Sequence, residues 1–369
     1  MKTVKLKDIS INNRGYYGIG ASAVDYDENK FTYLRITDID DDGSLNKNGL
    51  MSVDDEKSDQ YLLEKNDIVF ARTGASTGRN YFYDGEINNM VYAGFLIKFS
   101  LNPELVNPKF VKYYCLSQKY KEWISSSLTG STRPNINEKQ LSEMPIELPD
   151  RFYQDKVVEI LDSISQKIQL NNETNNNLHE LEKNLYKEYF KDLDDTNTQK
   201  LGDLCKIKYG KGLPTTKIET EGYSVYGGNG IIGYYHEFMY EESQVLISCR
   251  GAASGNVIVS KPHSFVTNNS LILECDRKYH HYLKQYSLDN YYYEYTTGSA
   301  QPQITIDNIK DIALNIPSEE LLDKFNKQME PLENKYFSNL EEISKLEQLR
   351  DTLLPKLMNG EIDLDNIEI

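Results

Sequence analysis

Residues 128–136 have the sequence LTGSTRPNI, and residues 296–304 have the related sequence TTGSAQPQI. At the same spacing, each stretch is followed by an apolar run that ends in proline, MPIELP at residues 144–149 and IALNIP at residues 312–317. From the shared glycine to the closing proline, the two copies stay 168 residues apart without a gap. This period is too long for a solenoid unit, so it predicts that one domain scaffold occurs twice in the chain.

Two further sequence blocks occur in both halves and in the same order. KLKDI at residues 5–9 corresponds to KLGDL at residues 200–204. A strand-like run ending in arginine and small residues occurs as DIVFARTGASTG at residues 67–78 and as VLISCRGAASG at residues 245–255. Between these blocks the halves differ in sequence and length. The pattern therefore predicts a duplicated scaffold that carries different variable segments.

Each half ends in a segment that is predicted to form a helix of about 40 residues. In the second half, apolar residues in steps of three and four form one stripe: Leu332, Tyr336, Leu340, Ile343, Leu346, Leu349, Leu353 and Leu357. The first half has leucines that match three of these at the offset of 168: Leu178, Leu181 and Leu185. The asparagine-rich residues 171–177 are typical of a loop, but their ungapped match to the second helix predicts that they stay helical.

Short β-rich runs separated by Gly, Asn and Asp turns open each half. We therefore predict an α+β protein with two mixed α/β globular domains, residues 1–150 and residues 193–317. Helices at residues 151–192 and in the segment 318–369 should join these domains. Two isolated apolar stripes must bury each other, so we expect an antiparallel coiled coil with pseudo-twofold symmetry.

The chain has 41 Lys and Arg residues against 57 Asp and Glu residues, a net charge of −16, which argues against a protein that simply coats nucleic acid. Residues 1–150 have 18 basic and 22 acidic residues, so a local basic face remains feasible there. No signal peptide and no run of about 18 apolar residues occurs, which predicts a cytoplasmic protein without membrane contact. The four cysteines form no CxxC pair, so we expect buried free thiols.

The sequence lacks the motifs of enzymes that act on DNA. None of its 11 prolines is adjacent to another, so it has no Asn/Asp-Pro-Pro-aromatic loop to hold a flipped adenine. It has no Gly-x-x-x-x-Gly-Lys-Ser/Thr motor motif and no nuclease triplet. His280 and His281 should point to opposite faces of a strand, and His179 should lie on a polar helix face. We therefore predict no catalytic residue, no metal and no cofactor for this chain.

At four places the sequence resembles the specificity subunit of type I restriction–modification systems (HsdS). KIQLNN at residues 167–172 is similar to the central helix of that family, and LLPKLMNGEI at residues 353–362 is similar to the end of its C-terminal helix. VYGGNGIIGY at residues 225–234 and YLRITDI at residues 33–39 resemble openings of its recognition domains. One departure is ELPDRF at residues 147–152, which replaces a more proline-rich entry to the first helix.

The resemblance implies a function that periodicity alone does not indicate. Each recognition domain would read one half of a bipartite double-stranded DNA target. Two methyltransferase subunits would dock on the helices, at the leucines Leu178, Leu181, Leu185, Leu346, Leu349 and Leu353, and two restriction subunits can join them. The partner subunit would bind S-adenosylmethionine and methylate adenine N6. A helix of about 40 residues spans roughly 60 Å, which limits the gap between half-sites to about 17 base pairs.

Arginines at two strand ends are the first candidates for DNA contact. Forked donors suit base edges, whereas hydroxyls and backbone N–H groups suit phosphates. Arg72 and Arg250 each follow an apolar strand and precede small residues that let the backbone approach a phosphate. Polar neighbours of these arginines complete the predicted group: Thr73, Ser76, Arg79, Ser254 and Asn256. The alternative is that each arginine pairs with a surface carboxylate.

Three further groups of polar residues are predicted to contact DNA. The repeated turn contributes Thr129, Ser131, Arg133 and Asn135, mirrored by Thr297, Ser299, Gln301 and Gln303, unless it is only a structural turn fixed by proline. The second half offers a phosphate strip of Lys208, Lys211, Thr215, Thr216 and Lys217, followed by Tyr226 and Asn229. The corresponding residues of the first half are Arg14, Tyr16, Tyr17 and Arg35.

Two other functions are compatible with these features. An independent DNA-binding regulator would bind its site without methyltransferase partners. A structural adaptor would bind proteins through its helices and no DNA, in keeping with the acidic charge. Replacement of Arg72 and Arg250 by alanine without loss of methylation would favour the adaptor.

Overall fold

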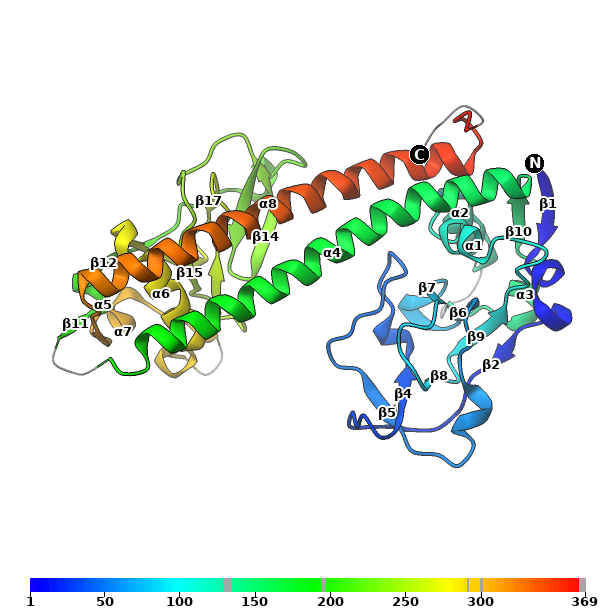
Figure 1. The fold of residues 1–369 in the computed structure, drawn as a ribbon, viewed down its shortest axis with the longest axis horizontal. Coiled ribbons are helices and arrows are strands. Elements are labelled where there is room, and N and C mark those ends of the chain that lie inside the picture. Colours follow the sequence, from blue (N-terminus) through cyan, green and yellow to red (C-terminus); the bar gives the residue numbers. More distant parts are fainter. Residues whose placement is uncertain (129–133, 194–196, 291, 299–300, 365–369) are drawn as a thin grey trace. The chain divides into compact units, whose positions relative to one another are not determined.

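The computed structural model describes residues 1–128, 134–193, 197–290, 292–298 and 301–364. Its internal contacts define two compact units, unit 1 (Met1–Ile168 and Ser344–Ile369) and unit 2 (Gln169–Ile343). Two 40-residue helices, α4 (Arg151–Phe190) and α8 (Glu319–Met358), contribute one end to each unit (Figure 1). Each unit therefore consists of a globular domain together with one end of each long helix.

Unit 1 has two four-stranded sheets and one strand pair among its described residues. One sheet is antiparallel with the order β2-β9-β6-β7, the other has the order β3-β5-β4-β8 with β4 and β8 parallel, and β1 pairs with β10. The strands are β1 (Lys2–Lys5), β2 (Tyr16–Tyr17), β3 (Ala23–Val24), β4 (Phe31–Leu34), β5 (Met51–Val53), β6 (Asp67–Ala71), β7 (Asn80–Tyr83), β8 (Met90–Tyr92), β9 (Leu96–Ser100) and β10 (Pro145–Leu148). The short helices are α1 (Pro108–Tyr114), α2 (Gln118–Ser127) and α3 (Glu138–Ser142).

Unit 2 repeats this arrangement. Its sheets have the orders β12-β18-β15-β16 and β14-β13-β17, with β13 and β17 parallel, and β11 pairs with β19. The strands are β11 (Thr198–Lys200), β12 (Cys205–Tyr209), β13 (Tyr223–Gly227), β14 (Gly230–Tyr235), β15 (Val245–Ser248), β16 (Val257–Val259), β17 (Phe265–Val266), β18 (Ser270–Cys275) and β19 (Ala313–Asn315). The short helices are α5 (Leu201–Leu204), α6 (Arg277–Asp289) and α7 (Ile306–Ile309).

One glycine in each unit makes the same close backbone contact with a neighbouring strand. A Cβ on Gly18 would lie 2.3 Å from the carbonyl oxygen of Tyr92, and a Cβ on Gly210 would lie 2.4 Å from that of Val266. Only glycine lets the backbone pass so close to the neighbouring strand. The predicted α+β class with two related domains and two long helices is confirmed.

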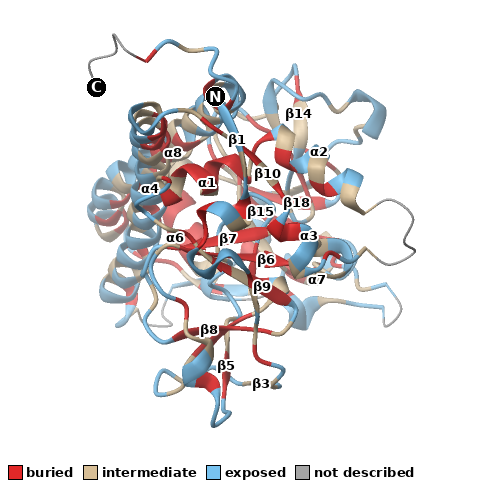
Figure 2. Cartoon of the chain, turned by 90° about the vertical axis from the view of Figure 1, so that its right-hand side faces the viewer, coloured by how far each residue is buried: buried red, intermediate tan, exposed pale blue. Residues whose placement is uncertain are grey.

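The core of each domain follows from its continuous apolar strands. All five residues of β6 and all four of β15 are buried, as expected for the central strands of sheets covered on both faces (Figure 2). In unit 1, Phe70 packs edge-on against Phe99, with ring centroids 6.1 Å apart. These strands end at the turns that carry the predicted arginines, so the core holds those turns in place.

The two long helices are antiparallel within each unit. In unit 1, the Tyr153 hydroxyl donates to the Leu357 carbonyl oxygen (3.1 Å). In unit 2, Asn339 Nδ2 donates to Asn175 Oδ1 (2.8 Å), and both asparagines are at most 4% exposed. The asparagine-rich run lies inside α4, as its match to the second helix predicted. The helix pair therefore contains a buried polar layer, which can fix the register of the two helices.

Residues 277–289 differ from expectation. The structure places His280 and His281 on α6, not on a strand, and both are buried. Asp276 caps this helix, because its side chain accepts from the Lys278 N–H (3.1 Å).

The sequence also led us to expect buried free cysteines and no membrane-spanning segment. All four cysteines are free; three are buried and Cys275 is partly buried. Cys205 and Cys275, far apart in sequence, face each other on neighbouring strands. Burial raises the pKa of both thiols to about 12. Within the part of the chain that the structure describes, no helix is long and apolar enough to cross a membrane.

Candidate nucleic-acid interface

The second and third repeated blocks meet in space in both units. In unit 1, Gly74 N–H donates to the Pro134 carbonyl oxygen (3.1 Å), and Ile136 N–H donates to that of Arg72 (2.9 Å). In unit 2, Gly251 N–H donates to Pro302 (3.0 Å), and Ile304 N–H donates to Cys249 (3.1 Å). From the sequence, these blocks were predicted as separate DNA-contacting groups. In the structure they form one surface beside the strand ends.

These hydrogen bonds also define which residues of the two units are equivalent. Gly74 corresponds to Gly251, and both adopt positive φ, +72° and +77°. Arg72 therefore corresponds to Cys249, and Arg250 corresponds to Thr73. The sequence comparison treated the two arginines as equivalent, and this assignment was wrong by one residue. Because side chains alternate between faces along extended backbone, the two arginines occupy different positions on the shared scaffold.

We call the resulting region of each unit the turn surface. In unit 1 it comprises residues 16–18, 72–74, 93–95 and 134–136, and in unit 2 residues 208–210, 249–251, 267–269 and 302–304. The backbone contacts agree, since Arg72 N–H donates to the Phe95 carbonyl oxygen (3.0 Å) and Cys249 N–H to that of Asn269 (2.9 Å). Most of the side chains differ, so the same backbone presents different chemical groups in the two units.

Unit 1 stacks two arginines on two tyrosines. The Arg72 guanidinium lies 5.0 Å from the ring centroid of Tyr17, and that of Arg14 lies 4.5 Å from Tyr16. Tyr16, Tyr17 and Arg14 line a groove of about 720 Å³ together with Tyr61 and Lys98. Tyr61, Lys98 and the neighbouring Phe95 were not among the predicted residues, because only the folded sheet brings them to this edge. Phe95 is 59% exposed.

Two predicted arginines of unit 1 are already paired with carboxylates. Arg35 Nε and Nη2 both donate to Asp38, at 2.9 and 2.6 Å. Arg79 Nε donates to Asp41 (2.6 Å). The predicted DNA contacts of these two arginines therefore compete with ion pairs inside unit 1. Thr73, Ser76 and Asn135 are partly or fully exposed near the turn surface.

In unit 2, two predicted contacts need correction. Tyr226 is 4% exposed and its hydroxyl accepts from the Lys261 N–H (2.9 Å), so it belongs to the core. Ser254 is 1% exposed and has no surface for DNA. Lys208 is on β12 and pairs with Glu274 on the adjacent strand (2.5 Å).

The remaining predicted residues of unit 2 fall into three groups. The exposed ones are Lys211, Thr215, Thr216, Lys217, Asn229, Arg250, Thr297, Gln301 and Gln303. Asn256 is half-buried and accepts from the Tyr293 hydroxyl. Ser299 lies outside the described residues, as do Thr129, Ser131 and Arg133 of the first half.

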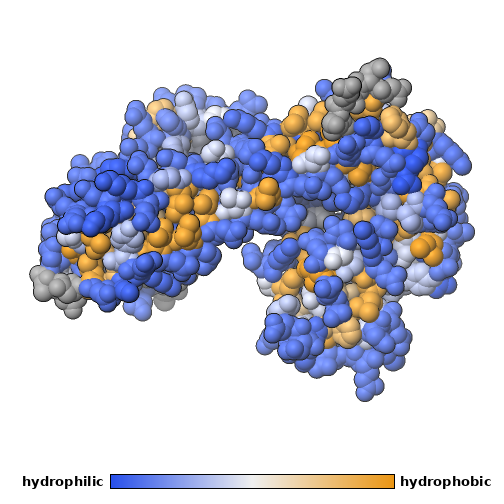
Figure 3. Space-filling view, in the orientation of Figure 1, coloured by the Kyte–Doolittle hydropathy of each residue, from blue (hydrophilic) through white to orange (hydrophobic). Residues whose placement is uncertain are grey.

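The six leucines predicted to bind a partner differ in exposure. Leu181 and Leu349, which are equivalent at the offset of 168, are 45% and 46% exposed. Leu178, Leu185, Leu346 and Leu353 are half-buried. The surface over the helices is mostly hydrophilic with separate apolar patches (Figure 3). Leu181 and Leu349 are thus the two most exposed members of the set.

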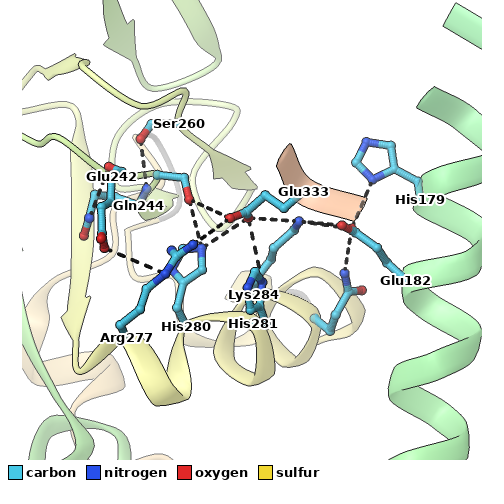
Figure 4. A network of polar contacts seen from close by, with 12 residues as sticks. His179, Glu182, Glu242, Gln244, Ser260, Arg277, His280, His281, Lys284 and Glu333 are labelled. Atoms are coloured by element: carbon cyan, nitrogen blue, oxygen red, sulfur yellow. Dashed lines mark hydrogen bonds and ion pairs between the residues drawn. The ribbon is translucent and has the colours of Figure 1, made fainter. Parts of the chain in front are cut away.

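A buried ion network in unit 2 links α6 to both long helices (Figure 4). Lys284 Nζ lies 3.0 Å from Glu182 of α4 and 3.3 Å from Glu333 of α8, and all three residues are at most 2% exposed. Burial alone would raise the pKa of Glu333, but hydrogen bonding from His280 and the charge of Lys284 hold it below its ordinary value. Burial lowers the pKa of His281 to about 4.

His280, His281 and Glu333 form the one group in the described ranges with the side chains and spacing of a metal site. Glu333 is already engaged, by Lys284 at 3.3 Å and by Arg277 at 3.2 Å. Two cations beside the carboxylate disfavour a third, so the group is better described as part of the ion network.

Comparison with known proteins gives consistent results. The profile of the family described as "Type I restriction modification DNA specificity domain" matches residues 1–180 and 194–348. The chain is 23% identical to the type I restriction enzyme HindI specificity subunit of Haemophilus influenzae, over 81% of this chain and 87% of the relative. It is also 23% identical to the MjaIX specificity subunit of Methanocaldococcus jannaschii, over 70% of each. The type I restriction–modification S subunit from M. genitalium has a similar fold, with a TM-score of 0.64, 19% identity and coverage of 96% and 95%.

Proposed function

Because the chain belongs to the family of type I restriction–modification specificity subunits (HsdS), we propose that it selects the DNA site of such a complex and has no catalytic role of its own. Unit 1 reads one half of a bipartite double-stranded target and unit 2 reads the other. One observation carries this proposal: the same backbone scaffold occurs in both units with different side chains at equivalent places on the turn surface, such as Phe95 and Asn269. A duplicated scaffold with unlike reading groups suits two half-sites of unlike sequence.

The helices α4 and α8 set the spacing between the half-sites and dock two methyltransferase subunits, which two restriction subunits can join in the cytoplasm. The methyltransferase subunit binds S-adenosylmethionine and transfers the methyl group to adenine N6. This division of labour is supported by the missing Asn/Asp-Pro-Pro-aromatic loop, since none of the 11 prolines is adjacent to another.

Co-expression of this chain with its methyltransferase subunit should produce methylated adenines in one bipartite motif, two specific half-sites separated by a fixed gap. Genome-wide mapping of N6-methyladenine in a host without other modification systems measures this directly. The methyltransferase subunit expressed alone is the control and should give no motif. A contiguous motif, or none, would contradict the proposal.

Replacement of Leu181 and Leu349 by glutamate should weaken binding of the methyltransferase subunits by roughly tenfold or more, because central apolar contacts dominate interface energies. Both side chains are nearly half exposed, so the substitutions should leave the fold intact. Co-purification and titration with the methyltransferase subunit measure the effect. Leu105, 55% exposed in a loop of unit 1, provides the matched control. Equal loss in the Leu105→Glu variant, or no loss at all, would exclude these leucines as the docking site.

A further inference from the structure

We infer that Arg72 reads a guanine through the major groove in the half-site of unit 1, whereas unit 2 has no reader at the equivalent position. This inference rests on the proposed function and names a specificity-determining residue within it. It starts from the state of the Arg72 side chain. Nε of Arg72 is buried without a hydrogen-bond partner. The guanidinium makes no hydrogen bond to any described residue, and its Cζ lies over the Tyr17 ring, 5.0 Å from the centroid.

Contacts of its backbone and of its guanidinium restrain Arg72. Its backbone N–H donates to Phe95 (3.0 Å) and its carbonyl oxygen accepts from Ile136 (2.9 Å), so three segments fix the Cα position. The guanidinium packs on Tyr17, and the Tyr17 hydroxyl accepts from the backbone N–H of Glu138 (3.2 Å). Because Nε is buried, the two terminal nitrogens, Nη1 and Nη2, are the donors left to form a planar fork, and such a fork is suited to bidentate recognition.

The chemistry of the base edges selects guanine as the partner. In the major groove, guanine presents two neighbouring acceptors, N7 and O6, whereas adenine, thymine and cytosine each present at most one acceptor beside a donor or methyl group. A planar fork of N–H donors matches two acceptors side by side. Phe95, whose carbonyl anchors Arg72 and whose ring is 59% exposed, adds apolar surface for base edges next to the fork.

Unit 2 differs at this position in a way that makes the assignment testable. The equivalent residue, Cys249, is completely buried and cannot reach DNA. Arg250 is exposed one residue later, at the position of Thr73. The guanine contact of Arg72 should therefore affect one half-site only.

The experiment maps methylated adenines for the complex containing Arg72→Ala, Arg72→Lys or, as the control, Lys57→Ala. We expect both Arg72 variants to keep the bipartite motif and its gap, but to lose discrimination at one guanine of one half-site by roughly tenfold to a hundredfold. Lysine keeps the charge but lacks the fork, so it should not rescue. Lys57 is an exposed cation of unit 1 that belongs to none of the predicted DNA contacts, and Lys57→Ala should leave every base of the motif unchanged.

Several outcomes would overturn the inference. Full rescue by Arg72→Lys with an unchanged motif would identify a phosphate contact. Uniform loss of methylation in Arg72→Ala, together with a lower melting temperature of the purified chain, would identify a structural role, as would an unchanged motif in every variant. Absence of a bipartite motif in the unmodified complex would instead refute the proposed function, so the two failures are distinguishable.

Discussion

Replacement of Lys284 by alanine should destabilise unit 2 by about 3–5 kcal/mol, because it leaves buried carboxylates without their shared cation. Glu182 and Glu333 are 1% and 2% exposed, and each lies within 3.3 Å of Lys284 Nζ. Hydrogen–deuterium exchange should show loss of protection in α6 and in the ends of α4 and α8 that belong to unit 2. Peptides of the globular domain of unit 1 should exchange as before.

Two variants make this prediction specific. Lys324 pairs with Glu320 on α8, but both side chains are more than half exposed, so Lys324→Ala should leave exchange almost unchanged. Neutralising the three buried groups together, in Glu182→Gln, Lys284→Met and Glu333→Gln, should recover much of the loss, since no unpaired charge stays buried. An effect of Lys284→Ala no larger than that of Lys324→Ala would mean that the network contributes little to unit 2.

Removal of one helical turn from both long helices should shorten the gap in the DNA target by one or two base pairs without changing the bases that are read. Residues 172–175 face residues 339–342 across the helix pair, as the Asn175–Asn339 hydrogen bond shows, so deleting both segments preserves the pairing. Four residues correspond to about 6 Å and to one turn plus roughly 40°. Two base pairs contribute about 7 Å and roughly 70°, so the change in length is matched and the twist differs by only about 30°.

Deletion of seven residues from each helix tests the same idea with a different twist. It shortens each helix by about 10 Å but rotates it by only about −20°, whereas three base pairs rotate DNA by roughly 105°. We expect this variant to lose methylation, while the four-residue variant keeps it. Mapped N6-methyladenine motifs provide the measurement. Altered bases at a constant gap would contradict the role of the helices in spacing.

Much of the fold could be predicted because the repeated blocks carry their own alignment. The offset of 168 located both long helices, and it showed that the asparagine-rich run stays helical although its composition favours a loop. The segment around His280 and His281 was mistaken for a strand. The sequence does contain signals for this helix. Asp276 is a favourable N-cap, and Tyr279, Tyr282, Leu283 and Tyr286 follow in steps of three and four, the spacing of one helix face that packs into the core. The adjacent histidines were considered alone, and this pattern was overlooked.

The candidate site was predictable in part. The turns that carry Arg72 and Arg250 could be identified from the sequence. However, the two turns were aligned on their arginines, whereas the correct alignment matches their glycines. Gly74 and Gly251 need positive φ, so they fix the register, and aligning them would have matched Arg72 with Cys249. Burial of Tyr226 and Ser254 could not be foreseen, because polar residues in a glycine-rich segment are compatible with either a surface loop or a buried strand end.

The way each domain is fastened to the helix pair has a consequence for protein engineering. In unit 2 the fastening uses Lys284 with Glu182 and Glu333, whereas in unit 1 Lys109 and Tyr113 bind Asp162. At the offset of 168, Glu182 on α4 corresponds to Arg350 on α8, and Glu333 on α8 corresponds to Ser165 on α4. Arg350 and Ser165 belong to unit 1, so the helix residues at the two attachment sites differ. A chimera that moves a domain from one position to the other would therefore place its attachment residues against a mismatched helix face. Such a chimera should fold only when the helix residues that bind the domain are transferred together with it.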